Sequence, residues 1–284
     1  MKILFFLFSG TGNTLRVGEE LKDALHSRGH EVEIIQIRKD TEIPPLDCDM
    51  LLFGYPVHAF NAPLPFLKFL KALPKKDLPA YLIRTSGEPL KLNDASGITP
   101  RRILKQKGYT VQGEYSIVMP YNIIFRHSDG MAARMWLSAK ARVLRAADEI
   151  SSYCIRRQRV NVFRRAVSFV LRIEHTAMPI IGRRFRVKDA CVGCGLCEKV
   201  CPQGNIVMRD GKPNFGKSCA GCMGCAFLCP KDAIKTSVLN GWRVNGEYFF
   251  TGAPAEDSEI CSYCHKAYLR YFHESETNNV KINK

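Results

Sequence analysis

The stretch CVGCGLCEKVCP, residues 191–202, recurs as CAGCMGCAFLCP at residues 219–230, and both copies read C-x-x-C-x-x-C-x-x-x-C-P. Disulfide frameworks do not require this order, and zinc sites use two C-x-x-C pairs or mixtures of Cys and His. A 4Fe–4S cubane needs four thiolates at tetrahedral corners, which three closely spaced cysteines and a distant fourth supply. The pattern therefore predicts two 4Fe–4S clusters held by Cys191, Cys194, Cys197, Cys201, Cys219, Cys222, Cys225 and Cys229.

This doubled run resembles that of bacterial ferredoxins, in which the fourth cysteine of each copy ligates the other cluster. The resemblance implies one ligand set of Cys191, Cys194, Cys197 and Cys229. It implies a second set of Cys219, Cys222, Cys225 and Cys201. Glycines between the cysteines let backbone N–H groups approach the sulfurs. We therefore expect a small α+β ferredoxin domain with 2x(4Fe-4S) over residues 182–239.

The amino-terminal sequence predicts a different kind of site. A short apolar run from Ile3 to Phe8 leads into Ser9-Gly10-Thr11-Gly12-Asn13-Thr14, and a helical pattern of apolar residues follows. Free N–H groups at the start of a helix and nearby hydroxyls can bind a phosphate dianion. The loop contains neither the P-loop pattern nor G-x-G-x-x-G, and no lysine follows. It therefore suits a single terminal phosphate.

The loop sequence S-G-T-G-N-T after a first strand resembles the phosphate loop of flavodoxins, which holds FMN; an ordinary strand-to-helix turn is the alternative. Further strands are expected at 32–37, 50–54, 81–85 and 115–119, with helices near 63–72, 95–107 and 131–153. This alternation predicts an α/β fold with a mostly parallel sheet. The resemblance implies a doubly wound, five-stranded, flavodoxin-like sheet of order 2-1-3-4-5 over residues 1–153.

Two later loops correspond to the flavin loops of flavodoxins. Their candidate cofactor-binding residues are Tyr55, Pro56, Val57, His58, Phe60, Asn61, Thr85, Ser86 and Gly87. An isoalloxazine ring needs flat apolar walls, for which Tyr55, His58 and Phe60 are candidates, although aromatic residues also pack beneath such loops. Asn61 and the 85–88 backbone are candidate contacts at the edge of the ring. Asn122 lies in a stretch that resembles flavodoxin–ferredoxin fusions, and no catalytic base or nucleophile is assigned.

The formal net charge of +15 is concentrated in one segment. Residues 131–190 carry 14 Lys and Arg against 4 Asp and Glu, whereas residues 1–130 carry 17 against 14 and residues 191–284 carry 11 against 9. Part of this segment, residues 154–181, is expected to be a helical connector. Its apolar residues at helical spacing are Val160, Phe163, Val167, Val170 and Leu171.

Three interpretations of this basic connector remain open. It forms the charged outer face of a helix packed on the two domains, docks an acidic redox partner protein, or makes transient contact with an anionic membrane surface. No nucleic-acid-binding fold accompanies its arginines, so no nucleic-acid partner is expected.

The carboxyl-terminal extension, residues 240–284, is expected to end in a helix from about 258 to 273. It contains Cys261-Ser262-Tyr263-Cys264-His265, which matches the C-x-x-C-H pattern of haem attachment. Packing of a terminal helix is the favoured interpretation of this stretch, and a metal site or a redox pair of thiols are the alternatives.

The sequence favours a cytoplasmic location. No stretch reaches the roughly 18 apolar residues of a membrane span. The opening apolar run is short and lacks the cleavage site of a signal peptide. Thiolates kept for iron imply a reducing compartment.

Taken over roughly residues 1–240, the sequence resembles the flavodoxin–ferredoxin fusion proteins of anaerobic bacteria, the EFR-type ferrodoxin family. The resemblance implies an electron-transfer protein that moves electrons between two 4Fe–4S clusters and FMN within one chain, converting between one- and two-electron chemistry in anaerobic metabolism. The alternatives are an FMN-dependent reductase of a small organic acceptor and a redox-sensing or membrane-surface interaction protein. No nicotinamide-binding fingerprint is present, which argues against a self-sufficient NAD(P)H enzyme. An electron carrier is favoured over a substrate-specific oxidoreductase.

Overall fold

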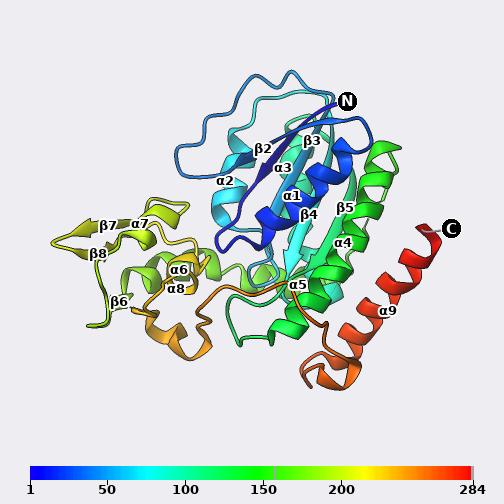
Figure 1. Ribbon diagram of the computed structural model, residues 1–284. Helices are drawn as coiled ribbons and strands as arrows, with labels where there is room; N and C mark the ends of the chain where they lie inside the picture. Colours follow the sequence, from blue (N-terminus) through cyan, green and yellow to red (C-terminus); the bar gives the residue numbers. More distant parts are fainter. Residues whose placement is uncertain (157, 283–284) are drawn as a thin grey trace.

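A computed structural model describes residues 1–156 and 158–282 of the protein, with side chains up to residue 276. Its larger domain is built on five parallel strands (Figure 1). They are β1 (Lys2–Leu7), β2 (Glu31–Gln36), β3 (Met50–Pro56), β4 (Pro79–Ser86) and β5 (Thr110–Val118). The strand order is β2-β1-β3-β4-β5, the flavodoxin-like order, so the predicted fold class is confirmed.

Helices cover both faces of this sheet. Alternate residues of β1 enter two separate cores, because successive side chains of a strand point to opposite faces. Phe5 and its neighbours on one face pack against α1 (Asn13–His26) and α4 (Asp129–Ser151). Phe6 on the other face lies in the core with α2 (Leu64–Ala72) and α3 (Ile98–Gln106). A strand buried on both sides reads as a continuous apolar run, which explains the opening sequence.

The cysteine motifs lie in a smaller domain, drawn in yellow in Figure 1. Its antiparallel pairs are β6 (Arg186–Val187) with β9 (Ile234–Lys235) and β7 (Ile206–Arg209) with β8 (Lys212–Phe215). Each cysteine run contains one short helix, α7 (Leu196–Val200) or α8 (Gly224–Phe227). Both helices begin after a residue in the left-handed region, Gly195 at φ 72° and Met223 at φ 59°. The repeat in the sequence is therefore also a repeat in the backbone.

The basic connector forms two helices, α5 (Val162–Leu171) and α6 (Glu174–Arg183), which lead from the larger domain to the smaller one (Figure 1). The first begins where the side chain of Asn161 accepts a hydrogen bond from the Arg164 N–H at 2.9 Å. Both charged residues such as Arg165 and apolar residues such as Phe163 are exposed on these helices, so the three interpretations of the connector stay open. Arg157, in the same basic stretch, lies outside the described residues.

The carboxyl-terminal extension returns to the larger domain. It contains two short 3-10 helices, η2 (Ser237–Trp242) and η3 (Asp257–Glu259), and then α9 (His265–Ile282), which packs against α4. A further 3-10 helix, η1 (Lys91–Gly97), lies in the larger domain. Helix α9 begins later than predicted, because Cys264 has a positive φ of 56° and interrupts any earlier helical turn. Cys261 and Cys264 thus precede the helix instead of lying one turn apart on it. Among the described residues, no helix is both long and apolar enough to cross a bilayer.

An aromatic cluster joins this extension to the larger domain. The ring of His127 stacks on Tyr121, with centroids 5.6 Å apart, and meets the edge of Tyr268 at 6.0 Å. Burial lowers the pKa of His127 to about 4. The folded protein therefore holds this imidazole neutral where the unfolded chain, with a pKa near 6.5, would begin to protonate it.

This depressed pKa predicts a loss of stability in acid. The contribution of His127 is complete above about pH 6.5 and falls as the pH drops towards its folded pKa of about 4. From about pH 8 to about pH 5 we expect a cost of about 2 kcal/mol, which His127→Phe should remove. Thermal unfolding of both proteins at the two pH values measures this difference. An equal drop in melting temperature for both would contradict the assignment.

Candidate redox-cofactor site

Loops at the carboxyl edge of the sheet enclose a cavity of about 400 Å³. They follow β1, β3, β4 and β5, and this edge is where open α/β sheets bind their ligands. Its size is that of an ordinary small-molecule site. The predicted cofactor-binding residues that line it are Ser9, Gly10, Thr11, Asn13, Thr14, Pro56, Val57, His58, Phe60, Thr85, Ser86 and Gly87.

Three predicted residues lie outside this lining. Tyr55 is fully buried beneath the loop and stacks on Phe66 at 4.7 Å, so it is a core residue and not a wall. Asn61 binds the connector, because its side-chain amide donates to the carbonyl of Ser168 at 2.9 Å. Gly12 shapes the turn into α1 with a φ of 99°, a conformation that glycine adopts without strain.

The Ser9–Thr14 loop is fixed to its surroundings by side-chain hydrogen bonds. The hydroxyl of Ser9 accepts from the Leu15 N–H at 3.3 Å, and the hydroxyls of Thr14 and Thr85 lie 2.8 Å apart. No acidic residue stands in the first turn of α1. The start of this helix therefore keeps the partial positive charge that favours an anion.

Residues after β5 complete the wall on the other side of this loop. Asn13 donates to the Pro120 carbonyl at 2.8 Å, and Asn122 donates to the hydroxyl of Thr11. Asn122 and its neighbours line the same cavity. The stretch that contains Asn122 thus contacts the Ser9–Thr14 loop directly.

Buried polar atoms in this lining lack partners. His58 Nδ1, Asn93 Oδ1 and Glu174 Oε2 are buried with no hydrogen-bond partner among the described residues. All three residues line the cavity, and His58 Nδ1 lies 3.6 Å from Glu174 Oε1. Native proteins rarely leave such atoms unsatisfied, so the lining fits a ligand with polar edges. The ring system and ribityl phosphate of FMN have this character.

Several lining residues were not identified from the sequence. Glu174 and Met178 come from the connector, Cys222 and Met223 from the second cysteine run, and Tyr263 from the extension. Glu174 could have been singled out, because it is the one acidic residue between positions 150 and 188. The others depend on how the domains dock, which leaves no local pattern in the sequence.

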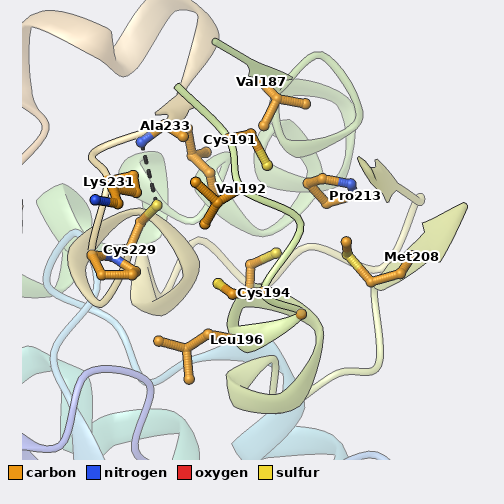
Figure 2. Close-up of a pocket in the computed structure, with 14 residues that line it drawn as sticks. Val187, Cys191, Val192, Cys194, Leu196, Met208, Pro213, Cys229, Lys231 and Ala233 are labelled. Carbon is orange, nitrogen blue, oxygen red and sulfur yellow. Dashed lines mark hydrogen bonds between the residues drawn. The ribbon is translucent and has the colours of Figure 1, made fainter. Parts of the chain in front are cut away.

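The eight cysteines surround two smaller cavities in the smaller domain. Cys191, Cys194, Cys197 and Cys229 line the first, and Figure 2 shows three of them around it. Cys201, Cys219, Cys222 and Cys225 line the second. These are the two sets that the resemblance to bacterial ferredoxins implies, and ligation by them stays a prediction.

The surroundings of the sulfurs suit a cubane. The backbone N–H of Asn205 donates to Cys201 Sγ at 3.3 Å, and that of Ala233 donates to Cys229 Sγ at 3.3 Å. These equivalent bonds reach the fourth cysteine of each run. In the described part of the chain, no three ligand-type side chains stand close enough to hold a single metal ion. Four thiolates around a cavity fit a cluster, whose sulfide-bridged irons keep the cysteines apart.

The second cluster cavity adjoins the cavity at the sheet edge. Cys222 and Met223 line both. A Cβ atom on Gly10 would lie 2.8 Å from Cys222 Sγ, and one on Gly224 would overlap the carbonyl oxygen of Gly10. Two glycines thus allow the Ser9–Thr14 loop and the second cysteine run to touch.

Comparison with known proteins gives a match in the smaller domain. Residues 190–234 match the family model of the 4Fe-4S dicluster domain. The strand order of the larger domain is the flavodoxin-like one. The chain joins a flavodoxin-like domain to a 4Fe–4S dicluster domain. No curated protein matches it significantly by sequence.

Solved flavodoxins are similar to the first domain of this fusion. Oxidised Flavodoxin 1 from Bacillus cereus is 16% identical, with a TM-score of 0.41, and covers 54% of this chain and 98% of its own. The flavodoxin of Streptococcus pneumonia TIGR4 is 14% identical, also with a TM-score of 0.41, over 54% and 99%. A flavoprotein in complex with FMN from Lactobacillus acidophilus NCFM is 15% identical, with a TM-score of 0.34, over 40% and 92%.

Removal of one cluster ligand should remove one cluster. We expect Cys201→Ala to lower iron from about eight to about four atoms per chain, because Cys201 lines the second cavity with three other cysteines. Cys154→Ala, at an exposed cysteine outside both runs, is the matched control and should keep about eight. Iron analysis and electron paramagnetic resonance of anaerobically purified protein measure both. Full iron content in Cys201→Ala would refute this ligand assignment.

Proposed function

We propose that the protein transfers electrons between two 4Fe–4S clusters and an FMN held within one chain. The observation that carries the proposal is the shared lining of the second cluster cavity and the sheet-edge cavity by Cys222 and Met223. A cluster passes single electrons, whereas a bound flavin exchanges one or two. Such a chain would interconvert one- and two-electron redox chemistry, and the resemblance to the fusions of anaerobic bacteria supports an anaerobic role.

The two clusters would have different surroundings. Cys194 and Val192 of the first cavity are exposed, with Val192 63% accessible. The second cavity adjoins the flavin site instead. This arrangement supports a path in which an external redox partner exchanges electrons at the first cluster and the second cluster exchanges them with the flavin.

The chain's own residues would bind and enclose the cofactor. The Ser9–Thr14 loop offers N–H groups and hydroxyls for the phosphate, as described above. His58 and Glu174 offer polar atoms that lack other partners among the described residues. Trp242 and Tyr263, from the extension, add aromatic surface that excludes water from the ring.

One observation favours a second candidate, the FMN-dependent reduction of a small organic acceptor. A cavity of about 450 Å³ meets the flavin cavity at Ser86, Glu88 and Asn93. Its lining combines basic and acidic side chains, among them Arg142, Arg270, Glu88 and Asp94, and so offers both donors and acceptors of hydrogen bonds. This candidate requires turnover of a small polar acceptor beyond the redox cycle of FMN itself.

A negative charge in the phosphate loop should expel FMN. Thr11 lines the cavity, and Thr11→Glu would place a carboxylate close to the cofactor phosphate. Two like charges about 4 Å apart repel by about 4 kcal/mol near a protein surface, so FMN should bind more than about tenfold more weakly. Flavin fluorescence titration and iron analysis measure the two cofactors separately. The exposed Thr251→Glu is the control, and unchanged FMN affinity in Thr11→Glu would reject this loop as the phosphate site.

Separating the two loops should slow electron transfer. The added methyl group of Gly224→Ala would overlap the Gly10 carbonyl and push the second cluster away from the flavin. Because electron transfer slows steeply with distance, flavin reduction by the clusters should slow several-fold. Gly241→Ala is the matched control, since nothing lies within 4 Å of its added Cβ. Stopped-flow absorbance follows the reaction, and an unchanged rate in Gly224→Ala with full iron and FMN would contradict the path.

A further inference from the structure

Helices α5 and α6 turn an apolar side towards solvent. A surface helix of a globular protein usually buries such a side against the core. On these two helices and the turn between them, six large apolar side chains are 60% to 80% exposed to solvent. They are Val162, Phe163, Phe169, Val170, Ile173 and Ile180.

The side of α5 that faces the protein is polar. Ser168 is buried, and its hydroxyl donates to Asn61 Oδ1 at 2.9 Å. Asn61 in turn donates to the Ser168 carbonyl at 2.9 Å, and Arg164 lies 3.9 Å from Asp94. Polar contacts therefore hold α5 to the larger domain, and they leave its apolar side without a partner among the described residues.

The two helices present one continuous stripe. Arg172 and Ile173, between them, keep right-handed helical torsions, with φ of −62° and −54°. Exposed residues then recur at helical spacing from Val162 through Phe169 and Ile173 to Ile180. We call these four residues, with Phe163 and Val170, the apolar stripe.

Arginines surround the apolar stripe. Arg159, Arg165, Arg183 and Arg184 are exposed, and none forms an ion pair with a described acidic side chain. Glu174, the one acidic residue between positions 150 and 188, turns towards His58 at the flavin cavity. Along these two helices the exposed side chains therefore combine apolar contact area with positive charge, while Glu174 is turned towards the cavity.

We propose that the apolar stripe and its arginines bind the surface of an anionic lipid bilayer. Helices with Phe and aliphatic residues on one side and basic residues beside them lie in the interfacial plane of membranes. Each arginine near such a surface adds attraction to anionic lipids. Exposed side chains that project from a helix can insert between lipids. A protein partner would instead need a groove of matching shape to bury them. Membrane binding of this kind goes beyond electron transfer, because it would determine the location of the protein in the cell.

Flotation of the holoprotein with lipid vesicles tests this surface. The protein should float with vesicles of phosphatidylcholine and phosphatidylglycerol and remain unbound with phosphatidylcholine alone. Added salt should weaken binding, since it screens the arginines. Absence of flotation with the anionic vesicles at low salt would overturn the proposal.

Matched variants separate the apolar stripe from a general charge effect. Phe163→Glu/Phe169→Glu should bind anionic vesicles at least about tenfold more weakly, because each change removes an exposed apolar side chain and adds a repelled charge. Phe249→Glu, at a phenylalanine that is 67% exposed outside the stripe, should bind almost as the parent does. Iron and FMN content show that each variant is folded.

Other occupants give distinct results. Unchanged vesicle binding by Phe163→Glu/Phe169→Glu would reject the stripe as the contact. A dimer in light scattering that this double variant dissociates, together with no vesicle binding, would assign the stripe to a second copy of the chain. Either result overturns the membrane proposal.

Discussion

The contact between the Ser9–Thr14 loop and the second cysteine run is the constraint on which the redox arrangement depends. Gly10 and Gly224 lack side chains where the two backbones touch, and any Cβ there would overlap the opposite loop. This close approach lets Cys222 and Met223 line both the sheet-edge cavity and the second cavity of the smaller domain. The two domains are thereby brought to a common site.

Further contacts keep the smaller domain in this position. Arg38 donates to the Lys199 carbonyl at 2.7 Å, and the Lys39 N–H donates to the Pro202 carbonyl at 2.8 Å. On the connector side, Ser168 is bonded to Asn61. The loops that follow β1 and β2 thus form part of the docking surface for the smaller domain.

Local sequence patterns predicted the strands of the sheet well, because the apolar runs that indicate a strand involve only neighbouring residues. The five strands and the cysteine sets follow from apolar runs and spacing, and neither requires knowledge of how the domains dock. Tyr55 shows the limit of this reasoning, since an aromatic residue after a strand has the same sequence signal whether it lines a cavity or packs beneath it. For a related reason, the sequence did not reveal which side of α5 faces the protein. Helical spacing reveals that a stripe exists, but the partners of Ser168 and Arg164 decide which side faces the protein.

Electron transfer between clusters and flavin within one chain has a kinetic signature of its own. Its most direct test is flash reduction of the clusters in anaerobic holoprotein, with flavin absorbance followed at several protein concentrations. We expect first-order flavin reduction with a rate constant that does not change with protein concentration. A rate that rises in proportion to concentration, or clusters that never reduce the flavin, would contradict it.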